Sequence, residues 1–370
     1  MAAKKARVSE NRTGSVFASE WMTKIRKKFG DNIVEVASEA HSIEVQRIPT
    51  GIFALDYALG GGFPAGRVNT VYGNKSAAKT TTILKAIGSA QTLCAICFTP
   101  TAGGCTCGEN RDSVAAFIDI EGTFEKKWAE AHGVVMDRLL ISRPEYAEQG
   151  LDIAEAMLRS NECDVLAIDS IAFLTAMKEI EESTEKDLVG TQARLLGKGI
   201  RKFVSALNQM ANENDGRKPT IFLVNQLRMK VGLMFGNPEV QPGGMAAGFA
   251  ASTETKFWSG KYKIDDDTKR PMSVEMNFRV EKNKTFAARM EGSFNLVLAD
   301  TQTKKLGAVH DEDFLISMGE KIGLVERKGV VWHVLGKEFR KKEDMETALL
   351  TDAAFGVEMR KTLMQVLLAS

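Results

Sequence analysis

The residues of this chain that are best suited to chemistry lie between Val68 and Leu84, in the stretch VNTVYGNKSAAKTTTIL. The apolar run Val68–Tyr72 predicts a buried strand, and helical spacing begins at Thr80. Between them, GNKSAAKT nearly matches the phosphate-binding loop G-x-x-x-x-G-K-[ST]. In such a loop, backbone N–H groups and a helix N-terminus surround the phosphates, a lysine reaches the terminal phosphates and a hydroxyl binds magnesium. The alternative is a helix start that binds nothing.

Lys79 is the lysine of this motif, and Thr80 carries the hydroxyl that would bind magnesium. The second glycine of the motif is replaced by Ala78, whose Cβ can strain a backbone that closely follows a ligand. The sequence therefore supports nucleotide binding more directly than hydrolysis. The residues expected to contact the nucleotide here are Gly73, Asn74, Lys75, Ser76, Ala77, Ala78, Lys79, Thr80 and Thr81.

Carboxylates follow two apolar strands that are predicted further along the chain. Asp169 ends the run VLAID, where a carboxylate can meet the magnesium of a phosphate-loop enzyme, usually through water. Glu121 lies two residues beyond a predicted strand at Val114–Asp119 and could accept a proton from the water that attacks the γ-phosphate. From the residues alone, a surface carboxylate in a turn explains Glu121 equally well.

The elements around these residues alternate as in a parallel sheet covered by helices. Strands are predicted at 114–119, 139–142, 165–169 and 220–226, and helices at about 125–132, 150–161 and 190–212. Polar residues that end these strands, including Gln226, then face the crevice where open α/β sheets bind ligands. Strict alternation from Met272 to Val280 predicts an antiparallel strand after the parallel core.

Both ends of the chain are expected to form smaller units. Residues 1–30 carry eight Lys or Arg against two Glu, so residues 1–14 are predicted to be a basic disordered arm, or one that touches a polyanion. Residues 15–30 predict an amphipathic helix that must pack on its own core or on a neighbouring chain, and residues 33–48 alternate loosely like a strand. Beyond Leu306 we expect a helix near 312–321, a hairpin around Gly329 and a last helix over about 343–368.

A stretch with five glycines follows the predicted strand at 220–226 and extends to Gly248. It contains Arg228, Lys230 and Phe235, and a long loop of this kind in a compact domain is usually functional or disordered. Glycines let backbone N–H groups approach phosphates, and the basic residues supply charge. We expect this loop to lack regular structure and to contact nucleic acid.

A second basic feature lies on the predicted helix at 190–212. Arg194, Lys198 and Arg201 fall on one face of this helix. A track for phosphates and an ordinary solvated face both explain the pattern, so it does not decide between them.

Four of the five cysteines cluster in the pattern Cys94-x2-Cys97-x7-Cys105-x-Cys107. In a reducing compartment such clustering favours a metal over disulfides, and four thiolates can close a tetrahedral zinc site. Reduced surface thiols remain the alternative, because the C-x-C half is tighter than the usual spacing. Cys163 lies apart and is predicted to be a small core residue.

The composition is that of a globular protein: of 370 residues, 44% are hydrophobic and 26% are charged. No apolar run approaches membrane-spanning length, and the N-terminus lacks the apolar centre of a signal peptide. We therefore expect a cytoplasmic protein with no membrane partner. The four histidines are scattered, so the sequence does not indicate histidine-based catalysis.

Five longer motifs stand out along the chain: IPTGIFALDYALGGGFPAGRVNTVYG, FIDIEGTF, VLAIDSIAFLT, NQLRMKVGLMFGNP and VEKNK. Through them the chain resembles the RecA family of bacterial and phage recombinases, from about Val16 to Leu368. The MFGNP loop and the KNK triplet are specific to that family. The resemblance implies an α/β fold: a RecA-type P-loop ATPase core with a mainly parallel central sheet and antiparallel edge strands. It further implies an N-terminal helix–strand polymerisation segment at 15–45, a core at 46–304 and a small α+β C-terminal domain at 305–370. The cysteine-rich segment at 94–110 is an insertion relative to the bacterial members.

The resemblance also implies roles in nucleotide hydrolysis. Glu121 matches the family's catalytic glutamate, and Gln226 matches the glutamine that senses the γ-phosphate and opens the second DNA-binding loop. Lys282 and Lys284 match lysines that reach the γ-phosphate of the neighbouring subunit. The adenine is expected to meet two further residues, Glu125 and Trp128.

For DNA, residues 179–190 match the family's first DNA-binding loop, and residues 227 to about 241 match the second. Val189 and Val231 stand where apolar side chains separate bound base triplets. Together with the glycine-rich stretch, these matches give the expected DNA-binding residues: Val189, Arg194, Arg201, Arg228, Lys230, Val231, Phe235, Gly243 and Gly244.

The function implied by the resemblance is an ATP- and Mg²⁺-dependent recombinase that polymerises on single-stranded DNA and exchanges strands with a homologous duplex. DNA should stimulate its ATP hydrolysis. Two alternatives are a related hexameric motor ATPase and a filament-forming DNA-binding protein that binds ATP with little hydrolysis, which Ala78 makes conceivable. The sequence ends at Ser370 without the acidic tail of bacterial members, so we expect no tail-based autoinhibition.

Overall fold

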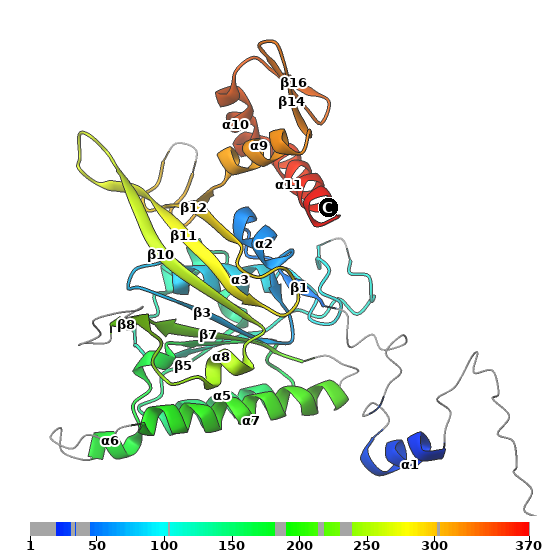
Figure 1. Cartoon of the computed structure of the whole chain (residues 1–370), viewed down its shortest axis with the longest axis vertical. Helices are drawn as coiled ribbons and strands as arrows, with labels where there is room; N and C mark the ends of the chain where they lie inside the picture. The colour runs from blue at the N-terminus through cyan, green and yellow to red at the C-terminus, as the bar shows by residue number, and fades with distance from the viewer. Residues whose placement is uncertain are drawn as a thin grey trace, which may run out of the picture.

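Nine strands form one central sheet in the computed structural model of the chain, which describes residues 20–30, 34, 45–102, 104–181, 190–213, 218–229, 239–301 and 304–369 (Figure 1). The parallel part of the sheet contains β3 (Val68–Gly73), β7 (Thr220–Gln226), β6 (Val165–Asp169), β4 (Ala115–Asp119) and β5 (Leu139–Ser142). The antiparallel part contains β10 (Thr253–Ile264), β11 (Pro271–Asn283), β12 (Glu291–Val297) and β13 (Val309–His310). Since β10 pairs in parallel with β3 and antiparallel with β11, it joins the two parts. The predicted α/β core with antiparallel edge strands is confirmed.

Helices cover both faces of the parallel strands, which explains why these strands read as continuous apolar runs. On one face lie α2 (Phe53–Leu59) and α3 (Lys79–Ala90), and on the other lie α5 (Ala147–Arg159) and α7 (Thr191–Glu213). In β6, Val165 and Ala167 pack in the first core, while Leu166 and Ile168 pack in the second. Each successive residue of β6 thus enters the opposite core, whereas Leu140 and Ile141 of β5, at the edge of the sheet, are exposed.

The carboxyl ends of the parallel strands meet at one edge of the sheet. Gly73 of β3 is registered against Gln226 of β7, and Asp119 of β4 is registered against Asp169 of β6. The residues that follow these strands therefore converge on a single crevice, as expected for an open α/β sheet.

Short elements complete the core. They are β1 (Arg47–Ile48) paired with β2 (Phe63–Pro64), β8 (Arg228–Met229) paired with β9 (Glu239–Val240), α4 (Lys126–Ala131), α6 (Met177–Glu181), α8 (Ala246–Ala250) and the 3-10 turns Met136–Arg138 and Ile171–Phe173. The β8–β9 pair corrects the expectation that the whole glycine-rich stretch lacks regular structure. Among the described helices, none combines the length and apolar character that crossing a bilayer would need.

The N-terminal part contains α1 (Glu20–Phe29), which lies apart from the core in Figure 1. Trp21 and Phe29 of α1 are both more than half exposed. Of the strand predicted at 33–48, only β1 is formed within the described residues. The predicted arm at 1–14, the first residues of the predicted helix and most of 31–44 lie outside them.

The C-terminal part contains α9 (Glu312–Lys321), β14 (Val325–Lys328), β15 (Val331–Val334), β16 (Lys337–Phe339), α10 (Lys342–Thr351) and α11 (Ala353–Ala369). The helix at 312–321 and the hairpin around Gly329 are confirmed. The prediction of a single last helix at 343–368 is wrong, because Asp352 is extended and separates α10 from α11. Its carboxylate accepts a hydrogen bond from the Phe355 backbone N–H at 3.1 Å and pairs with Lys337 at 2.7 Å, so it caps the second helix.

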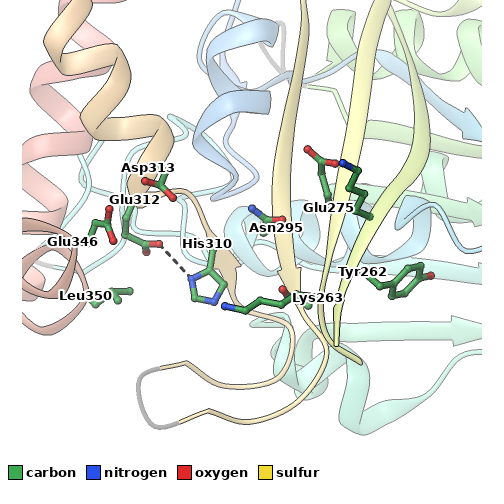
Figure 2. Close-up of a pocket in the computed structure, with 11 residues that line it drawn as sticks. Tyr262, Lys263, Glu275, Asn295, His310, Glu312, Asp313, Glu346 and Leu350 are labelled. Carbon is green, nitrogen blue, oxygen red and sulfur yellow. Dashed lines mark ion pairs between the residues drawn. The ribbon is translucent and has the colours of Figure 1, made fainter. Parts of the chain in front are cut away.

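A cavity of about 520 Å³ separates this C-terminal part from the antiparallel strands. Figure 2 shows Lys263 and Glu275 on the sheet side and Glu312 on the helical side, with an ion pair between His310 and Glu312. Glu312 also pairs with buried Lys304 at 2.5 Å. The cavity lining mixes both signs of charge, and its ion pairs join the two parts of the molecule.

Candidate nucleotide and DNA site

The phosphate loop connects β3 to α3, and its backbone has a positive φ at three positions, Gly73, Ser76 and Ala78. At Gly73 an added Cβ would lie 2.0 Å from the Phe257 carbonyl oxygen, so only glycine fits. Ala78, directly before α3, has φ +56° and ψ +23°, which is the left-handed conformation that glycine adopts most readily. The alanine therefore takes the turn that the motif needs and bears its strain.

Lys79 begins α3 and is buried. Its ammonium donates a hydrogen bond to the Asn74 carbonyl oxygen at 2.6 Å, across the loop. Burial lowers the pKa of Lys79, and the charges of Asp169 and Glu121 act in the opposite direction. A buried cation above a loop of backbone N–H groups suits a polyphosphate.

The Thr80 hydroxyl donates a hydrogen bond to the carboxylate of Asp169 at the end of β6. Burial raises the pKa of Asp169 to about 6, against the effect of the Thr80 hydrogen bond. Hydroxyl and carboxylate oxygens are ligands that Mg²⁺ prefers, so this pair fits the magnesium that phosphate-loop enzymes use.

Glu121 lies between two hydrogen-bond donors from neighbouring strands. Its Oε1 accepts hydrogen bonds from Ser170 Oγ and from Gln226 Nε2, each at 2.7 Å. A surface carboxylate in a turn would not explain these two hydrogen bonds. Glu121 lines a cavity of about 210 Å³ together with Lys79 and Asp169. The sequence did not single out Ser170, since one hydroxyl after a strand carries no periodic signal.

The geometry of the phosphate loop and of Glu121 agrees with the proteins to which this sequence is similar. The family model described as RecA N-terminal domain matches residues 18–103 and 104–302. The protein named Protein RecA of Francisella philomiragia subsp. philomiragia is 33% identical over 350 residues, which cover 94% of this chain and 88% of that protein. Protein RecA of Francisella tularensis subsp. novicida is 32% identical over 355 residues, with the same shares covered. The chain belongs to the RecA family.

The two residues expected at the adenine lie at the start of α4 (Glu125, its N-cap) and within it (Trp128). Glu125 is exposed and caps this helix, its two carboxylate oxygens accepting from the backbone N–H groups of Lys127 and Trp128 at 3.1 and 2.5 Å. Trp128 is half-buried, with its ring centre 4.5 Å from that of His132. Neither residue lines the cavity at the phosphate loop. Their contact with an adenine stays a prediction of the RecA resemblance.

Residues expected at DNA gather near the exits of β6 and β7. The Arg228 guanidinium donates to the Ala172 carbonyl oxygen at 3.2 Å, and Gln192 at the start of α7 donates to the same oxygen at 3.1 Å. Ala172 lies two residues after Ser170, whose hydroxyl donates to Glu121. The hydrogen bonds of Arg228 and Gln192 therefore end next to a residue that contacts Glu121. The start of the second expected DNA loop and the start of α7 are thus connected to the nucleotide cavity through the segment from Ser170 to Ala172.

Two glycines of this region pack closely on α7. A Cβ on Gly243 would meet the Leu196 side chain at 2.4 Å, and one on Gly244 would meet Ala193 at 3.2 Å. Pro242, which precedes Gly243, accepts a hydrogen bond on its carbonyl oxygen from the side-chain amide of Asn225 at 3.1 Å. Asn225 in turn directly precedes Gln226 in the chain.

The basic residues of α7 lie on its exposed side. Arg194, Lys198 and Arg201 are all exposed, opposite the buried Leu196 and Ile200. An exposed basic face of this kind is compatible with a track for phosphates and with an ordinary solvated surface. The expected DNA residues Val189, Lys230, Val231 and Phe235 lie outside the described residues.

Lys282 and Lys284 do not meet the phosphate loop of their own chain. The Lys282 ammonium donates to the Gly248 carbonyl oxygen of α8 at 2.6 Å, and Lys284 is exposed. Burial lowers the pKa of Lys282, and the charge of Lys284 adds to this. Neither lysine lines the cavity that contains Glu121. Their absence from this cavity is compatible with a role toward the nucleotide of a neighbouring subunit.

The four clustered cysteines lie away from this site, in the segment between α3 and β4. Their sulfur atoms lie within 4.8 Å of one another. Cys163 is buried in the core beneath α5 and α7, as predicted.

Proposed function

We propose that this RecA-family protein is an ATP- and Mg²⁺-dependent recombinase. It forms a helical filament on single-stranded DNA and exchanges strands with a homologous duplex. The observation that carries this proposal is the hydrogen bond at 2.7 Å between Gln226 and Glu121. It joins the nucleotide cavity to the strand that continues, two residues later, into the expected DNA segment at Arg228.

Within this proposal, the chain's own residues divide the chemistry of ATP hydrolysis. Lys79 binds the terminal phosphates, and Glu121 accepts the proton of the attacking water. Ser170 and Gln226 orient the Glu121 carboxylate through its Oε1. Magnesium, when bound near Thr80 and Asp169, would neutralise charge on the phosphates.

DNA binding is proposed to use the face beside β7. Arg194, Arg201 and Arg228 contact phosphates, which fix the register of the strand but carry no sequence information. Because Gln226 touches Glu121 and precedes Arg228 closely, a change at the γ-phosphate can alter the DNA segment. Val189 and Val231 are proposed to separate base triplets.

Filament formation is proposed to complete the active site. Lys282 and Lys284 of one subunit would reach the nucleotide of the next, and the segment at 15–45 would pack on that neighbour. We keep the core at 46–304 and the C-terminal domain at 305–370 as a proposed division. In its support, the C-terminal elements enclose a buried cluster of their own, around Ile316 and Met359.

A second candidate is a filament-forming DNA-binding protein that binds ATP with little hydrolysis. It is favoured by Ala78, because the left-handed backbone there carries a Cβ that glycine lacks. ATP hydrolysis measured with and without single-stranded DNA, beside electron microscopy with a slowly hydrolysed ATP analogue, separates the candidates. The recombinase gives helical filaments and DNA-stimulated hydrolysis, the second candidate gives filaments alone, and closed rings would indicate a hexameric motor.

A further inference from the structure

The cysteine segment between α3 and β4 contains a site that the proposed recombinase does not use. Cys94 is buried, Cys97 and Cys105 are half-buried, and Cys107 is exposed. The sulfur atoms of Cys94 and Cys107 lie 3.6 Å apart, and those of Cys105 and Cys107 lie 3.2 Å apart. We propose that these four thiolates bind one structural Zn²⁺ ion.

The sulfur distances fit this geometry. A tetrahedral Zn–S₄ site with Zn–S bonds of about 2.3 Å has sulfur–sulfur edges of about 3.8 Å. The separations in the cluster lie around that edge, and none exceeds 4.8 Å. A disulfide needs about 2.0 Å between sulfurs, so the cluster is not a pair of disulfides.

Two tight backbone turns bring the thiols together in pairs. The Phe98 N–H bonds the Cys94 carbonyl oxygen at 2.9 Å, closing the first turn, and the Gly108 N–H bonds the Cys105 carbonyl oxygen at 3.2 Å, closing the second. In addition, the Asn110 N–H donates to Cys105 Sγ at 3.1 Å. Donors of this kind stabilise a metal-bound thiolate and fix its orientation.

Apart from the cysteines, the segment is ordered mainly by hydrogen bonds, such as those from Thr101 N–H to the Thr92 carbonyl oxygen at 3.0 Å and from Thr106 N–H to Thr99 Oγ1 at 3.2 Å. From Ile96 to Asn110 no described residue is fully buried, and half-buried Phe98 is the apolar side chain of this stretch that packs against the main core. A bound metal can add to this limited packing, because its binding free energy becomes folding free energy. With four protein ligands and no open position, the site is structural and not catalytic.

The base of the segment is fixed to the core on both sides. Ala95 N–H bonds the Arg111 carbonyl oxygen at 2.9 Å, and Arg111 and Asp112 pair with Asp164 and Arg138 at 3.5 and 2.8 Å. The 12 residues of α3 separate the cluster from Lys79 by about 18 Å along the helix. Zinc therefore holds a projecting segment in shape without contact with the nucleotide.

The test is elemental analysis of the full chain, purified under reducing conditions without chelator. We expect about one zinc per chain in the wild type and in Cys163→Ala, the matched control whose thiol lies in the core. The double variant Cys105→Ser/Cys107→Ser should lose at least nine-tenths of the zinc. Less than a tenth of a zinc per chain in the wild type, with four freely titrating thiols, overturns the proposal, and iron in place of zinc overturns the choice of metal.

If the double variant does not fold, cobalt reconstitution of the wild type gives the answer. After zinc is removed with a chelator, Co²⁺ alone should produce the visible bands of a tetrahedral cobalt–thiolate site and protect four thiols from alkylation. Absence of these bands contradicts a tetrahedral four-thiolate site. ATP binding by Lys79 is expected to persist in the double variant, so failure of the zinc site and failure of the nucleotide site give different results.

Discussion

Ala78 is the residue at which this phosphate loop differs most from the motif, yet its backbone adopts the left-handed turn that glycine would take. An L-residue in this conformation bears roughly 1–2 kcal/mol of strain. Glycine removes the strain but gives the unfolded chain more freedom, which offsets about 0.5–1 kcal/mol. The two effects leave a small net gain for glycine.

We predict that Ala78→Gly stabilises the protein by up to about 1 kcal/mol and leaves ATP turnover unchanged or higher. Ala77→Gly is the matched control, because Ala77 is buried next to it without a positive φ, and it should destabilise. Denaturant unfolding and steady-state ATP hydrolysis measure both. A large loss of turnover in Ala78→Gly would mean that the loop geometry requires alanine.

Lys79 is the residue on which nucleotide binding depends most directly. Lys79→Ala removes a buried charge that can form charge-assisted hydrogen bonds to phosphate, so ATP affinity should fall by about tenfold to a hundredfold. ATP-dependent DNA binding should disappear with it. The control Lys361→Ala removes an exposed lysine of α11 and should bind ATP as the wild type does. Calorimetric titration with ATP decides, and unchanged affinity in Lys79→Ala would reject the site.

Residues at strand ends could be predicted from the sequence, and the groups that orient them could not. Asp169 and Gln226 end apolar runs, so topology alone brings them to the same edge of the sheet. Ser170 and the Gln192 amide act through one and two hydrogen bonds, respectively, between segments that are distant in the sequence. Such contacts depend on the packed structure and leave no pattern in the sequence.

At the scale of elements, the inner parallel strands β3, β4, β6 and β7 agree with their predictions because both their faces are buried and most of their residues are apolar. The C-terminal helices show the limit of periodicity. Apolar spacing continues from α10 into α11, but Asp352 forms a cap with Phe355 and an ion pair with Lys337. A local hydrogen bond thus ends a helix that hydrophobic spacing alone would extend.

The junction between the core and α9 gives a prediction about pH. Burial alone would raise the pKa of Glu312, but hydrogen bonds from His310 and Lys304, with the Lys304 charge, outweigh burial and lower the pKa to about 2. A carboxyl with a lowered folded-state pKa stabilises the fold fully above its unfolded pKa of about 4.3. This contribution is lost as pH falls from about 4.3 toward 2.

We therefore predict that Glu312→Gln lowers the unfolding midpoint at pH 7, with a cost of roughly 3 kcal/mol, because Lys304 stays buried without its carboxylate. Between pH 5 and pH 2 the variant should lose less stability than the wild type. Glu343→Gln, an exposed change on α10, should follow the wild type. Thermal melts across this range test it, and parallel curves for all three proteins would contradict the assigned pKa.

At the scale of the whole molecule, the proposed role of Lys282 and Lys284 implies that one chain does not contain a complete active site. They line no part of the cavity that holds Glu121, although the RecA resemblance gives them a role at a γ-phosphate. If they act in trans, the site is assembled only in the filament. ATP hydrolysis per subunit should then rise with protein concentration and with DNA.

We predict that Lys282→Ala keeps ATP binding near normal while turnover falls by on the order of 10²–10³, as for other preorganised charge stabilisers. Glu121→Gln should also be inactive, because it removes the base. Mixing the two variants should restore part of the hydrolysis, since an intact Glu121 of one chain can meet an intact Lys282 of the next. A mixture no more active than its separate components would return the lysines to ordinary surface residues.

The proposed recombinase activity is measured directly by strand exchange between a labelled single strand and a duplex, with Mg²⁺ and ATP present. We predict that the wild type transfers the labelled strand into a homologous duplex and not into a heterologous one of equal length. The Lys79→Ala variant should transfer the labelled strand into neither duplex. If the wild type binds DNA and hydrolyses ATP but transfers no strand into the homologous duplex, the protein is not a recombinase.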